Sequence, residues 1–266
     1  MSRLSEIFGT RNKCFLPFVT AGHPDLETTL EILLQLAGAG SDIIELGVPF
    51  SDPVADGTVI QRSSFSALEH GYSLDDMLDV IRQFRSQSDA GIILMSYMNP
   101  VYQFGLERLE ARAHEVGLDG ILISDLTPEE YVRLNPFKRL DTIFLAAPTS
   151  SDRRLEAISE SSRGFLYLVA RTGVTGRQTD VSESVPATVE RIRRFTDLPI
   201  AVGFGITTRK DVELVWQWAE GAVVGSAIVQ FIEENREAPD LPALVGKLVR
   251  GLLPAAQDRR LGRISS

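Results

Sequence analysis

Eight short apolar runs, spaced regularly along the chain, constrain its fold more than any other feature. Each run is rich in Val, Ile or Leu and is apolar at consecutive positions, which is typical of strands buried on both faces of a sheet. The runs are Cys14–Val19, Ile43–Gly47, Ile92–Met95, Gly120–Ile123, Thr142–Ala146, Phe165–Val169, Ile200–Phe204 and Ala222–Val224.

Amphipathic stretches between the runs predict helices. In the first of them Leu30, Leu33 and Ala37 share one face, and Asp25 precedes it as an N-cap. A polar, amphipathic segment at Met1–Gly9 predicts a short N-terminal helix. The predicted helices between the runs, of which the one with the Asp25 N-cap is the first, are Leu26–Ala39, Leu74–Phe84, Glu107–Val116, Glu129–Leu134, Arg153–Glu160, Val185–Phe195, Asp211–Trp218 and Leu241–Leu252. Several of them run into a glycine just before the next strand, which is typical of a helix C-terminus: Gly40, Gly117, Gly164 and Gly221.

Eight strand–helix units in succession predict a parallel sheet. At 266 residues the closed (β/α)₈, or TIM, barrel fits best, as a single domain over 1–266 with a polar tail at about 257–266. An open doubly wound sheet is the alternative. It more commonly uses about five to seven strands, and no G-x-G-x-x-G opens the first helix.

Composition limits the classes of function. The chain has 27 basic and 36 acidic residues, a net charge of −9, which disfavours nucleic-acid binding and a polybasic membrane anchor. The single cysteine, Cys14, excludes an intramolecular disulfide. The first residues lack the apolar core of a signal peptide, and no apolar stretch approaches the ~20 residues that span a bilayer. We therefore expect a soluble, cytoplasmic protein.

Glu45 is an anomaly within the second apolar run. Burying an unpaired carboxylate is costly, so this side chain must be paired, neutral or functional. It is either an ion pair with a neighbouring strand or a catalytic acid, and the sequence leaves both open. In a dry pocket its pKa is raised, which suits a general acid or base near neutral pH.

The loop that follows, residues 49–57, holds two more carboxylates, Asp52 and Asp56. Asp56 stands before Gly57, and turn chemistry alone explains this pair as well as catalysis does. Long loops over barrel mouths are often lids, and Pro49 and Pro53 stiffen this one.

Glycine-rich segments follow the last three runs. They are Ala170–Gly176, Gly203–Ile206 and Gly225–Ala227. Phosphate sites in barrels are typically built by the loops after the seventh and eighth strands, where glycine lets backbone N–H groups approach an anion. All three segments follow strands at the same end of the expected barrel, and this shared position predicts a phosphate site.

The positions of the lysines and histidines disfavour two types of reaction mechanism. None of the four lysines follows a strand, which disfavours a Schiff-base aldolase. The three histidines lack metal-ligand spacing, which disfavours a metal-dependent lyase and predicts no metal site. His23, after the first run, is placed to line the barrel mouth.

The residues 45–57, ELGVPFSDPVADG, resemble the signature of the tryptophan synthase alpha subunit family. Other segments match it in the same order, from Phe18 to Val229. They are residues 18–22, 171–176, 203–206 and 225–229. The resemblance implies a barrel that cleaves indole-3-glycerol phosphate to indole and glyceraldehyde 3-phosphate. It also implies no cofactor on this chain, and a beta-subunit partner in an alpha2-beta2 tetramer that holds pyridoxal phosphate.

The resemblance also implies roles for single residues. Glu45 and Asp56 match the catalytic carboxylates. Tyr97 and Asp125 match residues near the second loop or its support, and Tyr97 is also implied to bind substrate. The other matches, which are implied to bind substrate or to close over it, are Phe18, Tyr167, Thr175, Gly176, Phe204, Gly205, Gly225 and Ser226. The chain departs from the family's usual residues at His23, Thr58, Thr127 and Ala170.

Three other functions remain open from the sequence. One is a stand-alone indole-releasing lyase of the same descent. Another is a non-catalytic phosphate-binding regulatory subunit, against which the Glu45 and Asp56 pair argues. The third is an isomerase or epimerase acting on another phosphorylated sugar, which phosphate loops alone do not exclude.

Overall fold

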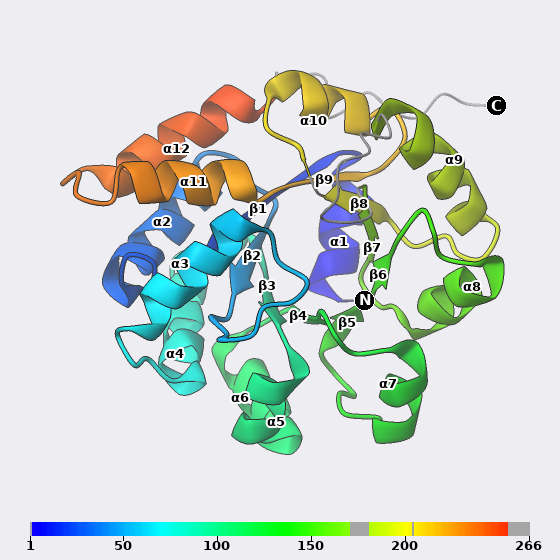
Figure 1. The fold of residues 1–266 in the computed structure, drawn as a ribbon, viewed down its shortest axis with the longest axis horizontal. Coiled ribbons are helices and arrows are strands. Elements are labelled where there is room, and N and C mark those ends of the chain that lie inside the picture. The colour runs from blue at the N-terminus through cyan, green and yellow to red at the C-terminus, as the bar shows by residue number, and fades with distance from the viewer. Residues whose placement is uncertain (1, 171–180, 204, 255–266) are drawn as a thin grey trace.

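The computed structural model describes residues 2–170, 181–203 and 205–254. Within them, parallel strands form one curved sheet with helices around its outside (Figure 1). The order in the sheet is β5-β4-β3-β2-β1-β9-β8-β7-β6. The strands are β1 (Cys14–Thr20), β2 (Ile43–Gly47), β3 (Gly91–Ser96), β4 (Gly120–Ile123), β5 (Asp141–Ile143), β6 (Leu145–Ala146), β7 (Leu166–Val169), β8 (Ile200–Gly203) and β9 (Gly221–Val224).

The sheet closes through a break in the predicted fifth strand. The sequence predicts one strand over Thr142–Ala146, whereas the structure has β5 before Phe144 and β6 after it. β5 pairs with β4, and β6 pairs with β7, so one residue joins the two ends of the sheet. The Tyr167 N–H donates to the Phe144 carbonyl at 3.1 Å. The (β/α)₈ barrel is therefore confirmed, and the open doubly wound sheet is wrong.

The predicted helices are all present, with small shifts at their ends. No helix in the described ranges has the length and apolar character needed to cross a bilayer. The helices are α1 (Arg3–Thr10), α2 (Leu26–Gly38), α4 (Leu74–Arg85), α6 (Leu106–Val116), α7 (Pro128–Leu134), α8 (Asp152–Ser161), α9 (Val181–Arg193), α10 (Arg209–Val215) and α12 (Leu241–Leu252).

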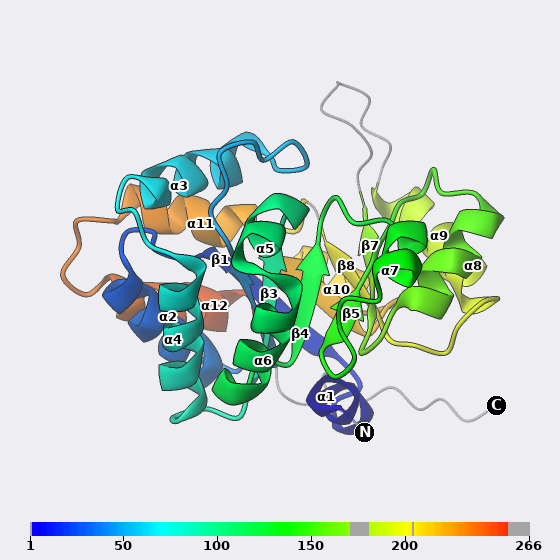
Figure 2. The ribbon, with the colours of Figure 1, turned by 90° about the horizontal axis from the view of Figure 1, so that it is seen from below.

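Three further helices, which the sequence patterns did not predict, lie in the loops after strands. They are α3 (Thr58–Leu68), α5 (Met98–Phe104) and α11 (Ser226–Glu234). Figure 2 shows α3 and α11 at one end of the barrel and α1 at the opposite end. The strands β2 and β9 run toward α3 and α11, so this is the end at which the side chains following the strands converge.

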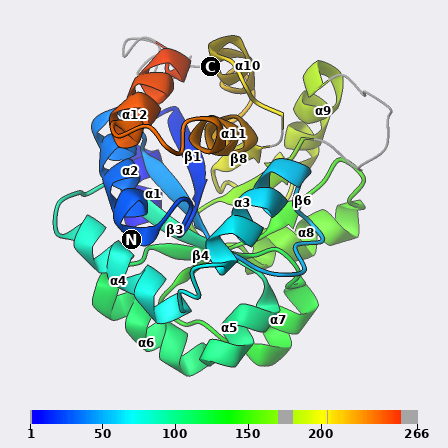
Figure 3. The same ribbon diagram turned by 60° about the vertical axis from the view of Figure 1, so that its left-hand side comes forward.

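Local sequence explains the helix ends. The Asp25 carboxylate accepts a hydrogen bond from the Thr28 N–H at 2.7 Å, which confirms the predicted N-cap of α2. After α6, Gly117 has a φ of 76°, a left-handed conformation that glycine adopts without strain. Figure 3 shows α2, α4 and α6 following one another around one side of the barrel.

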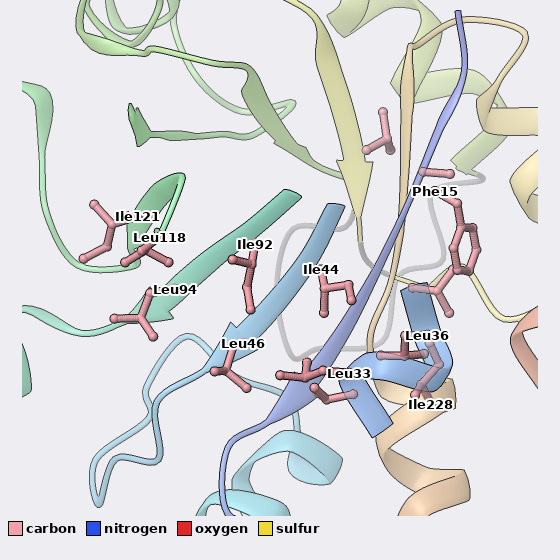
Figure 4. Packing of buried hydrophobic residues seen from close by; sticks show 14 of the residues in the cluster. Phe15, Leu33, Leu36, Ile44, Leu46, Ile92, Leu94, Leu118, Ile121 and Ile228 are labelled. Atoms are coloured by element: carbon pink, nitrogen blue, oxygen red, sulfur yellow. The ribbon is translucent and has the colours of Figure 1, made fainter. Parts of the chain in front are cut away.

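Alternate strand residues face two separate cores. The outer core lies between strands and helices and contains Ile44 and Leu46 of β2, which lie near Leu33 of α2 (Figure 4). The inner core fills the barrel and contains Ile43. Because side chains alternate along a strand, Glu45 faces the barrel interior.

Helix α1 closes the floor of the barrel. Leu4 is completely buried in the inner core, and the Phe8 and Phe165 rings lie 5.5 Å apart between centroids. Apolar side chains fill this end of the interior. Among the described residues, the cavity that contains Glu45 lies toward the opposite end.

Candidate active site

A cavity of about 310 Å³ lies at the carboxyl ends of the strands. It brings together residues from β1, β2, β3, β7 and β9, which are far apart in the sequence. None of the described residues that line it is Lys, Arg or His. The lining residues are Phe18, Glu45, Asp56, Gly57, Ile60, Met95, Tyr167, Gly205, Ile206, Thr207, Val223, Gly225 and Ser226.

Glu45 is 1% exposed, and neither of its carboxyl oxygens has a hydrogen-bond partner among the described residues. It lies beside Phe18 of β1 and Ile93 of β3 in the sheet register. Burial raises the pKa of Glu45 from 4.5 to about 8. Among the described residues, no side chain forms an ion pair with Glu45. The ion pair with a neighbouring strand, which the sequence leaves open, is therefore not found there. The group is a protonated acid at neutral pH.

Asp56 is half-buried at the end of the loop over residues 48–57. Burial raises its pKa from 3.8 to about 6, and a hydrogen bond from the Tyr97 hydroxyl opposes that rise. The N-cap of the next helix is Gly57, and no side chain caps it. Helix capping therefore does not explain the Asp56 carboxyl, which instead lines the cavity with Glu45.

Glycines make room for two aromatic rings in the cavity wall. A Cβ at position 47 would lie 2.4 Å from Cζ of Phe18, and a Cβ at position 203 would lie 2.1 Å from the Tyr167 hydroxyl oxygen. Both distances are shorter than any non-bonded contact of a Cβ, so a larger residue at either position would displace the aromatic ring. Burial raises the pKa of the Tyr167 hydroxyl, and so does the negative charge of Glu45 and Asp56 nearby. The rings offer apolar, flat surface beside the two carboxyls.

Backbone groups gather on another part of the lining. Gly205 has a φ of 82°, and Gly225 is the N-cap of α11, which has no side-chain cap. The N–H groups at the start of a helix lack partners within the helix and favour an anion. The predicted residues Gly205, Gly225 and Ser226 line the same cavity as Glu45 and Asp56.

Several predicted positions fall outside this cavity. Tyr97 borders a smaller neighbouring pit, where Asp56 and Phe18 are also found. Asp125 accepts a hydrogen bond from the Met98 N–H at 2.7 Å and supports the start of α5. Thr175, Gly176 and Phe204, as well as the tail over 257–266, lie outside the described residues.

Six lining residues are not among the site residues predicted from the sequence. Met95 and Val223 are apolar strand residues, and nothing in their type distinguishes a cavity wall from a core. The other four stand in or next to the motifs quoted above, which is the available signal: Gly57, Ile60, Ile206 and Thr207. Together they make the lining more apolar than the predicted residues alone indicate.

Comparisons with known proteins agree with this geometry. The sequence model of the family described as tryptophan synthase alpha chain matches residues 4–245. The chain belongs to this family. Members from Solibacter usitatus and Geotalea uraniireducens are 42% and 44% identical over 259 and 243 residues. These matches cover 95% and 89% of this chain, and 97% and 91% of the relatives.

Solved structures support the same assignment. The tryptophan synthase alpha subunit from Legionella pneumophila has a TM-score of 0.86 at 34% identity, covering 95% of this chain and 97% of that one. A chain of the tryptophan synthase a2b2 complex from Pyrococcus furiosus has a TM-score of 0.83 at 36% identity, covering 91% and 98%. Fold and sequence therefore agree along nearly the whole chain.

The four departures from the family's usual residues all lie outside the cavity lining. Thr58 begins α3, and Thr127 caps α7 through a reciprocal pair of hydrogen bonds with Glu130. Ala170 is 4% exposed. The sequence predicts that His23 lines the barrel mouth. This prediction is wrong for the cavity, because His23 is not among its lining residues. It is 2% exposed, with its Nε2 3.1 Å from Glu233 of α11.

Proposed function

We propose that this chain catalyses the tryptophan synthase alpha reaction, the cleavage of indole-3-glycerol phosphate to indole and glyceraldehyde 3-phosphate. The observation that carries the proposal is a single cavity with a buried, unpaired acid, a second carboxyl, and the open start of a helix. Membership in the tryptophan synthase alpha chain family supports it.

The reaction needs an electron sink, and the substrate's own indole ring is one. Glu45, protonated at neutral pH, gives its proton to indole C3 and makes an indolenine. The bond between C3 and the glycerol chain then breaks, and its electron pair returns to the ring. The Glu45 carboxylate takes the proton of the glycerol hydroxyl as that carbon becomes the aldehyde, so the acid is regenerated.

Asp56 has the complementary role. With a pKa of about 6 it is ionised at neutral pH. Its carboxylate accepts a hydrogen bond from the indole N–H and stabilises the positive charge that appears on the ring after protonation at C3. Two carboxyls with different surroundings thus hold different protonation states at one pH.

The remaining lining fits the rest of the substrate. Phe18 and Tyr167 flank the planar ring, and the phosphate meets the N–H groups at Gly205, Gly225 and Ser226. These N–H groups must hold the phosphate without help from a charged side chain, since the described lining has no cation. By the same family membership, we propose that indole passes to a beta subunit, which carries the pyridoxal phosphate, in an alpha2-beta2 assembly.

Indole release from indole-3-glycerol phosphate tests the proposal. The full chain is assayed alone and with a beta subunit, together with Glu45→Gln, Asp56→Asn and the exposed control Glu213→Gln. We expect the loss of Glu45 to lower kcat by about 10²-fold or more, the usual contribution of a general acid, with the control unchanged. A strong rise with the beta subunit favours a complex over a stand-alone lyase. An active Glu45→Gln with intact fold would refute the mechanism.

A further inference from the structure

The Tyr97 hydroxyl joins the loop over residues 48–57 to the barrel. Tyr97 is 4% exposed and follows β3 directly. Its oxygen accepts a hydrogen bond from the Ala55 N–H at 3.0 Å and donates one to the Asp56 carboxyl. One hydroxyl therefore contacts two consecutive residues of the loop, the second of which lines the cavity.

The Tyr97 ring is itself fixed. It packs against Phe50 at the other end of the loop, with the ring centroids 5.1 Å apart. The next residue, Met98, donates its N–H to the Asp125 carboxylate at 2.7 Å. The loop between these contacts is exposed, and Val54 is 84% exposed. Tyr97 thus provides a rigid point against which a solvent-exposed loop is held.

We propose that Tyr97 is a positioning residue, which acts through Asp56 rather than on the substrate. By donating a hydrogen bond, its hydroxyl keeps the Asp56 carboxylate turned into the cavity and in its charged form. The inference rests on the proposed function, and it assigns to Tyr97 a role different from the substrate contact that the family resemblance implies. Tyr97 is not among the residues that line the cavity, and it borders the adjoining pit together with Asp56 and Phe18.

The hydrogen bond matters because, among the described residues, few other groups favour the charged form of Asp56. Within that part of the chain, the ionisable side chains near it are Glu45 of β2, Tyr97 after β3 and Tyr167 of β7, and Asp125 after β4 interacts electrostatically with Tyr97. All four are neutral or negative. A donor to a carboxylate lowers its pKa, so the loss of the hydroxyl leaves burial unopposed.

Tyr97→Phe removes the hydroxyl and keeps the ring on Phe50. For a hydrogen bond to a charged group, the expected rise in the pKa of Asp56 is about one to two pH units. The acid limb of kcat/KM moves up by the same amount, and activity near pH 6 falls by about 5- to 50-fold. Tyr102→Phe is the matched control, because Tyr102 is 65% exposed on α5, and we expect it to behave as the wild type.

Titration of the Asp56 carboxyl by carbon-13 NMR measures the shift without turnover, with Asp56→Asn identifying the signal. The NMR titration tests the role of Tyr97 even if the chain releases no indole. Absence of indole release would refute the proposed function but not the role of Tyr97. An unchanged Asp56 titration in Tyr97→Phe overturns the inference. A higher KM with an unmoved acid limb also overturns it, since that pattern shows direct contact with substrate.

Discussion

Glu45 should destabilise the folded protein at the pH at which the enzyme works. Its pKa is about 8 when folded against 4.5 in the unfolded chain. Between these values the folded state binds more protons than the unfolded state, so the free energy of unfolding falls as pH rises. At 1.36 kcal/mol per pH unit, the loss between about pH 5 and about pH 8 is about 3–4 kcal/mol. Above the folded pKa the loss is complete.

Glu45→Gln removes this dependence because an amide does not ionise. We expect the variant to match the wild type near pH 5, where both side chains are neutral, and to be about 3–4 kcal/mol more stable near pH 8. Urea unfolding at the two pH values measures the difference, and equal m-values show that the unfolded states are comparable. Glu213→Gln, at an exposed position, should show a difference that does not change with pH.

A stability difference between Glu45→Gln and the wild type that stays constant from pH 5 to pH 8 would refute the reasoning. It would mean that Glu45 is ionised in the folded state, paired with a charge or with water. The expected result instead makes Glu45→Gln more stable and inactive, the usual relation between a buried catalytic acid and the stability of its fold.

Three further changes test the barrel around the site. Leu4→Ala in the buried floor should cost about 2–5 kcal/mol in urea unfolding, with KM unchanged, because the floor lies at the end opposite the cavity. Gly203→Ala should lower the Tm and raise KM, since its Cβ would overlap the Tyr167 hydroxyl. Burial lowers the pKa of His23, although Glu233 opposes this. The His23 contribution to stability should therefore fall as pH drops below about 6.5, opposing the contribution of Glu45, and His23→Gln should make the gain in stability on acidification larger than in the wild type.

The strands could be predicted from the sequence because both faces of each are buried. Every residue of β1, β2 and β4 is buried, so the apolar runs coincide with the strands. The break at Phe144 could not be predicted in this way. The run is apolar throughout, and it divides only because its first half pairs with β4 and its second half with β7. Pairing partners are a property of the closed barrel, not of the run.

The missed helices have local reasons. α3 contains Gln61, Arg62, Ser63 and Ser64 in succession, so its apolar stripe is weak. α5 has a proline at its third residue, Pro100, which usually signals a loop but is tolerated in a first helical turn. The start of α11 appears in the sequence as a glycine-containing motif, which does not predict a helix. The missed helices are thus those whose own sequence is polar, contains a proline or begins within a glycine motif, although α5 and α11 also bury residues in the outer core.

The sequence indicates a functional role more clearly for Glu45 than for Asp56. Glu45 is conspicuous because a carboxyl within an apolar strand must be neutral, paired or functional, and strand alternation alone turns it into the barrel. Asp56 is inconspicuous, because an aspartate before a glycine is common in turns. Its character depends on Tyr97, which is 41 residues away in the sequence and is brought to it by the pairing of β2 with β3. An acid that keeps its proton needs only burial, whereas a carboxylate that must stay charged beside it needs a donor from elsewhere in the fold. In the proposed mechanism, the chemistry of the site therefore depends on the hydroxyl of Tyr97 as well as on the burial of Glu45.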